Sequence, residues 1–140
     1  MTQFFKATIF AATLSIIVSA PATKADDCAN ATGGQAGLDD CYDKAFKKSD
    51  AELNKLYKQI EARIKDDAAT TKLLVTAQKA WVAFRDGECN FQSAGASGGS
   101  IGPMIYSMCL DGLTQSRIKD FQGYLKCEEG DTSCPVPPGN

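Results

Sequence analysis

The stretch that decides the fold is Ala77-Gln78-Lys79-Ala80-Trp81-Val82-Ala83-Phe84-Arg85-Asp86-Gly87-Glu88-Cys89. It places a tryptophan, a phenylalanine and an adjacent arginine–aspartate pair on one predicted helix that ends at a cysteine. Another cysteine, Cys109, lies near the start of the next predicted helix. A disulfide between the ends of two helices makes a rigid small module. This stretch therefore predicts a helical protein held together by disulfides.

Apolar residues recur at steps of three and four, as one helix face requires, over three segments: about 38–66, 69–91 and 103–126. On the first segment they are Tyr42, Ala45, Phe46, Leu53, Leu56, Tyr57, Ile60 and Ile64. On the second they are Leu73, Leu74, Ala77, Trp81, Phe84 and Phe91, with Glu88 as a polar member of the series. On the third they are Ile105, Met108, Cys109, Leu113, Phe121, Tyr124 and Leu125. Asp67 or Thr70 can cap the second helix.

No strand-like alternation of useful length appears in the chain. The sequence therefore predicts an all-α fold, a small three-helix antiparallel bundle. This bundle consists of a helical hairpin plus a third helix and is held by disulfides. Residues 26–134 form a single domain, and the Pro- and Gly-rich residues 135–140 are expected to be a disordered tail.

The first 25 residues are typical of an export signal. Lys6 supplies a positive start, the run from Ala7 to Ala20 is apolar, and small residues follow. Cleavage is predicted after Ala25, with Ala22 as the alternative. The apolar run is too short for a membrane anchor, which needs about 20 residues, so no stable membrane insertion is expected after cleavage. Two acidic residues before Cys28 argue against a lipoprotein.

Six cysteines follow the predicted signal: Cys28, Cys41, Cys89, Cys109, Cys127 and Cys134. An even number in an exported chain indicates three disulfides. About fifteen pairings are possible for six cysteines. Neighbours in sequence are the favoured partners, namely Cys28–Cys41, Cys89–Cys109 and Cys127–Cys134, although other pairings remain open. A zinc site is disfavoured because the chain has no histidine and no CxxC pair.

The charge of the chain bears on its partners. Removal of residues 1–25 takes away Lys6 and Lys24 and no acidic residue, so the net charge changes from −2 to −4. Nucleic acid is excluded as a partner, because phosphate binding needs a basic surface. A basic protein is the better candidate. The oligomeric state is left open by the sequence.

An enzymatic function is not expected. Without histidine, the Ser-His-Asp and Cys-His arrangements are absent. Asp86 and Glu88 are two residues apart on a helix and therefore point about 200° apart, so they cannot flank one scissile bond. No catalytic residue, cofactor or metal is assigned.

A structural network is predicted among Asn54, Trp81, Arg85, Asp86 and Arg117. Both arginines can point inward from neighbouring helices toward these polar groups. The favoured interpretation is a set of ion pairs and hydrogen bonds that fixes helix register, with a ligand anchor as the alternative. Trp81 is expected to pack in the core rather than to form a binding surface, because its neighbours at helical spacing are apolar.

The connector between the second and third helices is a different kind of segment. Residues 93–100 are small and polar and contain three glycines, so they are expected to be an exposed, flexible loop that cannot hold a helix. Its tip and exit are the candidate partner-binding residues Ser97, Gly98, Gly99, Ser100 and Ile101. A Cys89–Cys109 disulfide at its base would lower the ordering cost of binding. A plain helix connector is the alternative.

Three motifs resemble the LprI-like domain, a family of small exported bacterial proteins. They are Leu53-Asn54-Lys55-Leu56-Tyr57, the stretch from Ala77 to Cys89, and Cys109-Leu110 with Leu113-Thr114 and Arg117. The family's name-giving member inhibits c-type lysozyme, a basic enzyme with two cleft carboxylates. The resemblance therefore implies a periplasmic or secreted inhibitor that binds this enzyme at its cleft. The alternative is a non-inhibitory envelope module that binds another protein or a cell-wall fragment.

Overall fold

The computed structural model describes residues 28–139. Three α-helices form it: α2 (Gly34–Ile64), α3 (Ala68–Ser93) and α4 (Gly102–Leu125), with a short 3-10 turn, η1 (Ala94–Ala96), before α4. No strand occurs within this range, so the prediction of an all-α, three-helix fold is confirmed. The predicted signal sequence, residues 1–25, lies outside the described part of the chain.

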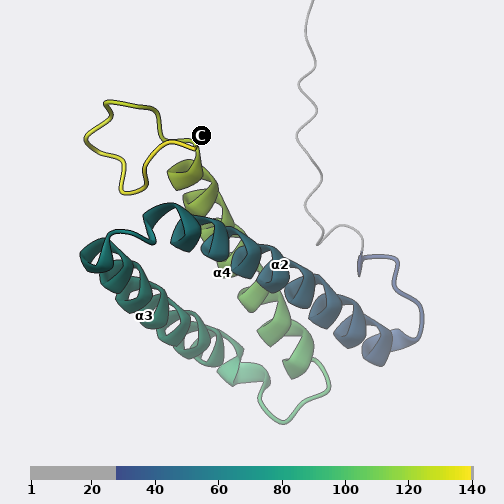
Figure 1. The fold of residues 1–140 in the computed structure, drawn as a ribbon. Coiled ribbons are helices and arrows are strands. Elements are labelled where there is room, and N and C mark those ends of the chain that lie inside the picture. The colour runs from purple at the N-terminus through teal and green to yellow at the C-terminus, as the bar shows by residue number, and fades with distance from the viewer. Residues whose placement is uncertain (1–27, 140) are drawn as a thin grey trace, which may run out of the picture.

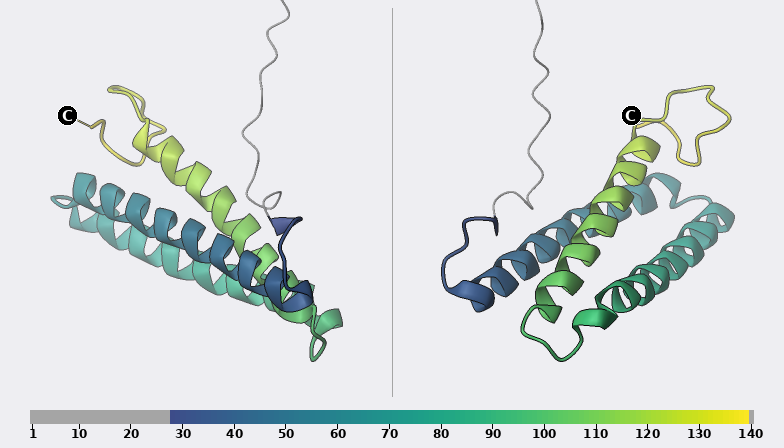
Figure 2. Two further views of the ribbon diagram at one scale, coloured as in Figure 1. Left: turned by 90° about the vertical axis from the view of Figure 1, so that its right-hand side faces the viewer. Right: turned by 180° about the vertical axis from the view of Figure 1, so that it is seen from behind.

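The helices run in alternating directions. α2 and α3 form an antiparallel hairpin, and α4 returns antiparallel to α3 and crosses α2 (Figures 1 and 2). Over the described residues, no helix has the length and apolar character that a membrane crossing requires. The connector between α3 and α4 lies at one end of the bundle, and the C-terminal loop lies at the other (Figure 1).

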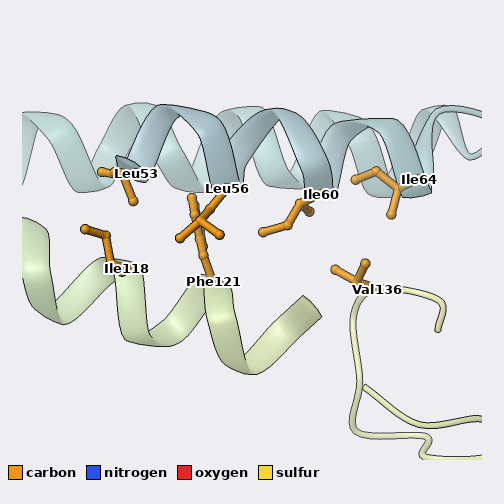
Figure 3. Packing of buried hydrophobic residues seen from close by; sticks show 7 residues of the cluster. All are labelled: Leu53, Leu56, Ile60, Ile64, Ile118, Phe121 and Val136. Atoms are coloured by element: carbon orange, nitrogen blue, oxygen red, sulfur yellow. The ribbon is translucent and has the colours of Figure 1, made fainter. Parts of the chain in front are cut away.

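The core lies chiefly between α2 and α4. Its apolar side chains extend toward each other from these two helices and from the C-terminal segment (Figure 3). The buried members are Leu53, Leu56, Ile60, Ile64, Ile118, Phe121 and Val136. The four from α2 follow one another at steps of three and four residues, as predicted for a buried helix face. Partly buried Leu74 and Trp81 bring α3 against this cluster.

The prediction for α3 is only partly right. Three apolar residues of its predicted series face solvent: Leu73 is 69% exposed, Phe84 is 56% exposed and Phe91 is 77% exposed. The buried residues of this helix are Arg85 and Cys89. The helix carries apolar residues on more than one side, and periodicity alone does not decide which side meets the other helices.

The first helix begins four residues earlier than predicted, at Gly34 rather than at Leu38. Gly33, at the N-cap, has a φ of +96°, a conformation that glycine adopts without strain. Inside the first turns, a Cβ on Gly37 would clash with the Thr32 carbonyl oxygen. The glycine-rich lead-in therefore allows the preceding chain to cross closely over the helix start.

The three disulfides join neighbours in sequence, which is the favoured pairing: Cys28–Cys41, Cys89–Cys109 and Cys127–Cys134. Their Cα–Cα distances are 5.7, 5.5 and 5.7 Å, within the usual range for a disulfide. The first joins the lead-in to α2, the second joins α3 to α4, and the third closes the C-terminal loop on itself.

The C-terminal tail differs from the expectation of disorder. Within residues 135–139, Val136 is 3% exposed and belongs to the core cluster. The Nη1 atom of Arg63 donates to the carbonyl oxygens of Leu125, at 2.9 Å, and Pro137, at 3.5 Å. Prolines restrict the chain on both sides of Val136, which lowers the entropy lost when this apolar side chain docks. The Pro- and Gly-rich composition predicted disorder because composition does not show that a single residue, Val136, packs into the core.

Asp67 is the residue that caps α3. Its carboxylate accepts hydrogen bonds from the backbone N–H groups of Ala69 and Thr70, both at 3.0 Å, and from the Thr70 hydroxyl at 2.7 Å. The bonds from Thr70, followed by that from Ala69, lower the pKa of Asp67 below its ordinary value. The sequence left Asp67 and Thr70 open as caps, and the structure assigns the cap to Asp67.

We expect Leu53→Ala to lower the free energy of unfolding by about 3 kcal/mol, because it leaves a cavity in the core. Leu73→Ala is the matched control. Its side chain is 69% exposed, so its cost should stay below about 0.5 kcal/mol. Urea denaturation at low micromolar protein, followed by circular dichroism, measures both. Equal losses in the two variants would contradict the burial of these leucines.

The cap also predicts a pH dependence. Because the folded-state pKa of Asp67 lies below the unfolded value, its contribution is fully present above the unfolded pKa of about 4 and is lost as pH falls through the folded pKa. Asp67→Asn keeps a capping oxygen without this titration. Denaturation between pH 2 and 5 should therefore show a shallower stability loss for Asp67→Asn than for the wild type. Parallel curves would argue against the lowered pKa.

Candidate functional site

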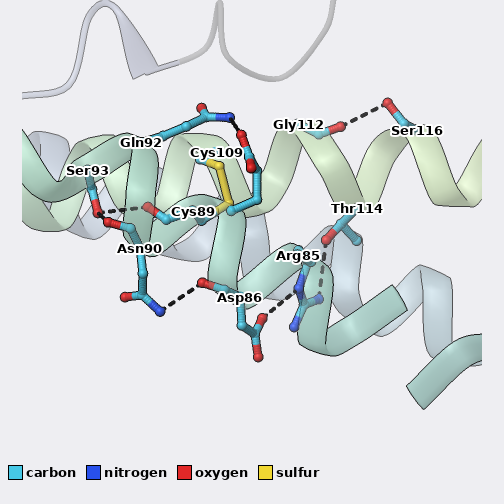
Figure 4. The surroundings of a disulfide bond; sticks show 11 residues. Arg85, Asp86, Cys89, Asn90, Gln92, Ser93, Cys109, Gly112, Thr114 and Ser116 are labelled. Carbon is cyan, nitrogen blue, oxygen red and sulfur yellow. Dashed lines mark hydrogen bonds and ion pairs between the residues drawn. A yellow bond between two sulfur atoms is a disulfide. The ribbon is translucent and has the colours of Figure 1, made fainter. Parts of the chain in front are cut away.

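Arg85 is the centre of the polar contacts among the three helices. Its guanidinium donates from Nη1 to Asp50 Oδ1 on α2 at 3.0 Å and from Nε to Asp86 Oδ1 at 2.9 Å. Nη1 also lies 3.4 Å from the Thr114 hydroxyl on α4. The Arg85 side chain is 9% exposed, and its neighbours around the disulfide are visible in Figure 4. A single buried cation therefore contacts all three helices.

Aromatic rings and arginines alternate beside this centre. The Arg85 guanidinium lies 5.2 Å from the Phe46 ring centroid and 5.3 Å from that of Trp81. Arg117 lies 5.8 Å from the Trp81 centroid and 4.6 Å from that of Phe121. Such cation–π contacts are stronger when the cation is desolvated. The five residues form a ladder that crosses from α2 through α3 to α4.

Asn54, the remaining predicted residue, joins the same network of contacts through Asp50. Asn54 donates from Nδ2 to the backbone carbonyl of Asp50 at 2.8 Å and to its carboxylate at 3.0 Å. Asp50 in turn pairs with Arg85. Arg117 donates from Nε to Gln78 at 3.3 Å and pairs with Asp120 at 3.5 Å.

All five predicted network residues are thus connected through direct contacts or through Asp50. Sequence reasoning missed Asp50, Phe46 and Thr114 as partners. A signal was present in the helical spacing, because Phe46, Asp50 and Asn54 follow one another at steps of four on α2. These buried contacts fit a structural role for Arg85 better than that of a ligand anchor, since the guanidinium already has protein partners.

The end of α3 is joined to α4 just beyond this network. Cys89 is buried and bonds to Cys109, which lies seven residues after the start of α4 (Figure 4). Ser93 donates its hydroxyl hydrogen to the Cys89 carbonyl oxygen at 2.8 Å. The disulfide therefore fixes the two helix segments from which the connector leaves.

The connector is more ordered than predicted. Residues Ala94–Ala96 form the turn η1, although the segment was expected to hold no helix. Backbone hydrogen bonds continue through it, from Ser97 to Ala94, from Gly99 to Ala96 and from Gly102 to Gly99. Small residues permit this compact path, and a Cβ on Gly102 would lie 2.8 Å from the Ala96 carbonyl oxygen.

The candidate binding residues project from this turn structure. Ser97, Gly98, Gly99, Ser100 and Ile101 are all exposed, and Ile101 has 44% of its surface accessible. Gly98 has a φ of +79°, which favours glycine at that position. Phe91 and Met108, which flank the connector on the two helices, are 77% and 41% exposed. This end of the bundle thus offers hydroxyl and apolar groups on a backbone held at both sides.

The carboxylates considered for catalysis have local partners. Asp86 pairs with Arg85, and Glu88 accepts a hydrogen bond from Gln92 at 2.8 Å. Among residues 28–139, no group of three or more potential metal ligands occurs. A shallow pocket at the opposite end, beside the C-terminal loop, is lined by several carboxylates around Arg63.

The fold and these contacts define a class of small, disulfide-linked helical proteins. Within that class the chain belongs to the lysozyme inhibitor LprI family, whose model matches residues 25–121. The family's name describes an inhibitor of an enzyme rather than an enzyme. Together with the disulfides, membership in it indicates an exported protein.

Two relatives illustrate the extent of the similarity. An uncharacterized protein of Rhizobium meliloti is 35% identical over 114 residues, which cover 74% of this chain and 81% of the relative. An uncharacterized protein of Rickettsia conorii is 51% identical over 35 residues, which cover 23% of this chain and 69% of the relative. No solved structure matches the chain.

We expect Arg85→Ala to destabilise the fold by about 2–3 kcal/mol, because it removes contacts to three helices and leaves Asp50 and Asp86 without their cation. The loss is held below that of a fully buried pair by the partial exposure of both carboxylates. Lys44→Ala is the control, since its pair with Asp40 is mostly exposed and is worth about 0.5 kcal/mol or less. Urea denaturation compares them, and an equally small effect in Arg85→Ala would count against the network.

Proposed function

We propose that the protein is a periplasmic or secreted inhibitor of c-type lysozyme that binds the enzyme at its cleft through residues 97–101. The exposed connector, with its backbone fixed by turn hydrogen bonds and by the Cys89–Cys109 disulfide, is the observation that carries this proposal. Membership in the LprI family supports the class of partner.

Preorganisation is the first physical argument. A flexible loop loses conformational freedom when it binds, and this loss weakens affinity. Here the connector already has bonds from Ser97, Gly99 and Gly102 to preceding carbonyl groups. Its ends are held by helices that a disulfide joins. Most of the conformational entropy of the connector is therefore lost during folding, so little is left to be lost during binding.

Chemical complementarity is the second argument. Lysozyme cleaves its substrate with two carboxyl groups in a cleft. The hydroxyl groups of Ser97 and Ser100 are exposed donors that can hydrogen-bond to such carboxylates. Ile101 and Phe91 add apolar contact area at the same end. The net charge of −4 after signal removal would speed encounter with a basic enzyme.

The test is lysis of a bacterial cell suspension by a c-type lysozyme, with and without the oxidised protein. We expect dose-dependent slowing by the wild type and at least about a ten-fold weaker inhibition by Ser100→Trp, because the bulky ring would obstruct cleft entry. Ser116→Trp, at an exposed position on α4, is the matched control and should inhibit normally. Gly98→Val, which is strained at positive φ, should also lose inhibition.

Different outcomes separate the alternatives. Equal inhibition by Ser100→Trp and the wild type would move the binding site away from the connector. No inhibition by the wild type at a large molar excess would reject the lysozyme proposal and favour a non-inhibitory envelope module. Lysis of cells by this protein alone would instead indicate an enzyme.

A further inference from the structure

One face of α3 carries an exposed stripe that the core and the connector do not use. The stripe consists of Leu73, Ala77, Ala80, Phe84, Gly87 and Phe91, all exposed. The steps between them alternate between four and three residues, so they average about 3.6, the period of the α-helix, and stay on one side of the helix. From first to last the stripe covers about 27 Å of helix.

We propose that this stripe, here called the α3 stripe, binds the same stripe of a second copy in an antiparallel homodimer. The proposal goes beyond lysozyme binding and does not depend on it. A contiguous exposed apolar surface of this kind typically marks an interface. None of the six stripe residues is charged, so no desolvation of a charge opposes its burial.

The order of residue sizes fits a two-fold symmetric pairing. In an antiparallel pair centred near residue 82, Leu73 lies opposite Phe91 of the other copy and Ala77 lies opposite Gly87. At the centre, Phe84 of each copy lies opposite Ala80 of the other. The small residues thus leave room for the central rings, and the leucine and phenylalanine at the ends close the contact. Such self-complementarity is what a two-fold interface requires.

A parallel pair fits the same residues less well. Phe84 would then face Phe84, and Ala77 and Ala80 would face their own copies, so crowded and empty layers would alternate. The charges beside the stripe give the same preference. On one flank of the stripe, Lys72 and Lys79 lie in the first half of α3, whereas Asp86 lies in the second. Antiparallel pairing brings opposite charges together, and parallel pairing brings like charges together.

The dimer would leave the connectors accessible. Each connector follows the C-terminal end of its α3, so antiparallel helices place the two connectors at opposite ends of the pair (Figure 1). The buried contacts of Arg85 with α2 and α4 lie away from the exposed stripe and would be unchanged. A dimer of this kind could present two binding surfaces at once.

Sedimentation equilibrium of the oxidised chain from residue 26 measures the association. We expect the wild type to change from one to two chain masses with rising concentration. Phe84→Glu should raise the dimer dissociation constant by about a hundred-fold, because it places two charges at the centre of the contact. Ala62→Glu, exposed on α2, adds the same charge elsewhere and should leave the constant unchanged. Phe91→Glu provides a second stripe variant, and circular dichroism checks folding of each.

A cross-link tests the orientation. Ala83, beside the centre of the stripe, lies near its own copy in either orientation, whereas Asn90, exposed on the same side of α3 near the end of the stripe, lies near its own copy only in a parallel pair. Ala83→Cys should therefore give covalent dimers with a short bismaleimide, whereas Asn90→Cys and the control Ala62→Cys should give few. A single chain mass up to about 1 mM, or association insensitive to both glutamate variants, would overturn the proposal. So would a monomer whose stripe variants lose lysozyme inhibition, because the stripe would then contact the enzyme.

Discussion

The position of α3 depends on one buried cation. α2 and α4 are joined by apolar packing, but the buried residues of α3 are Arg85 and Cys89. Arg85 bonds to α2 through Asp50 and approaches α4 through Thr114, while Phe46 and Trp81 cover its sides. A guanidinium has enough donors in a fixed plane to meet several partners at once. The disulfide from Cys89 then holds the end of α3, and with it the connector.

The sequence predicted most of the fold because its signals are local. Periodic apolar residues placed three helices within a few residues of their ends, and neighbouring cysteines were the favoured disulfide partners. Local signals failed where long-range contacts decide the result. The start of α2 depends on close passage of the chain at Thr32, and the tail depends on one valine that reaches the core. Asp50 is 35 residues from Arg85, so spacing alone could not pair them.

At the candidate binding end, too, local features were predicted and features set by long-range contacts were not. Small and polar residues predicted an exposed connector, and residues 97–101 are exposed. Its turn structure was not predicted, because glycine-rich composition is compatible with both a mobile loop and a compact one. The hydrogen bonds and the helices on either side select the compact form. The exposure of Phe91 beside it could not be predicted either, since an apolar residue in a helical pattern is usually assigned to the core.

α3 departs from the usual arrangement of a surface helix. Its inner side buries an arginine with polar partners, while its outer side exposes Leu73, Phe84 and Phe91. If the bundle were the complete assembly, each of these exposed apolar side chains would have an unfavourable hydration free energy that no packing offsets. If a second copy covered the outer side of α3, these side chains would be buried and this unfavourable hydration would be removed. The polar inner contact then sets the orientation, because a buried arginine tolerates few alternative positions, and the apolar outer side remains available for association. The proposed dimer would thus assign specificity within the chain and association between copies to opposite faces of one helix.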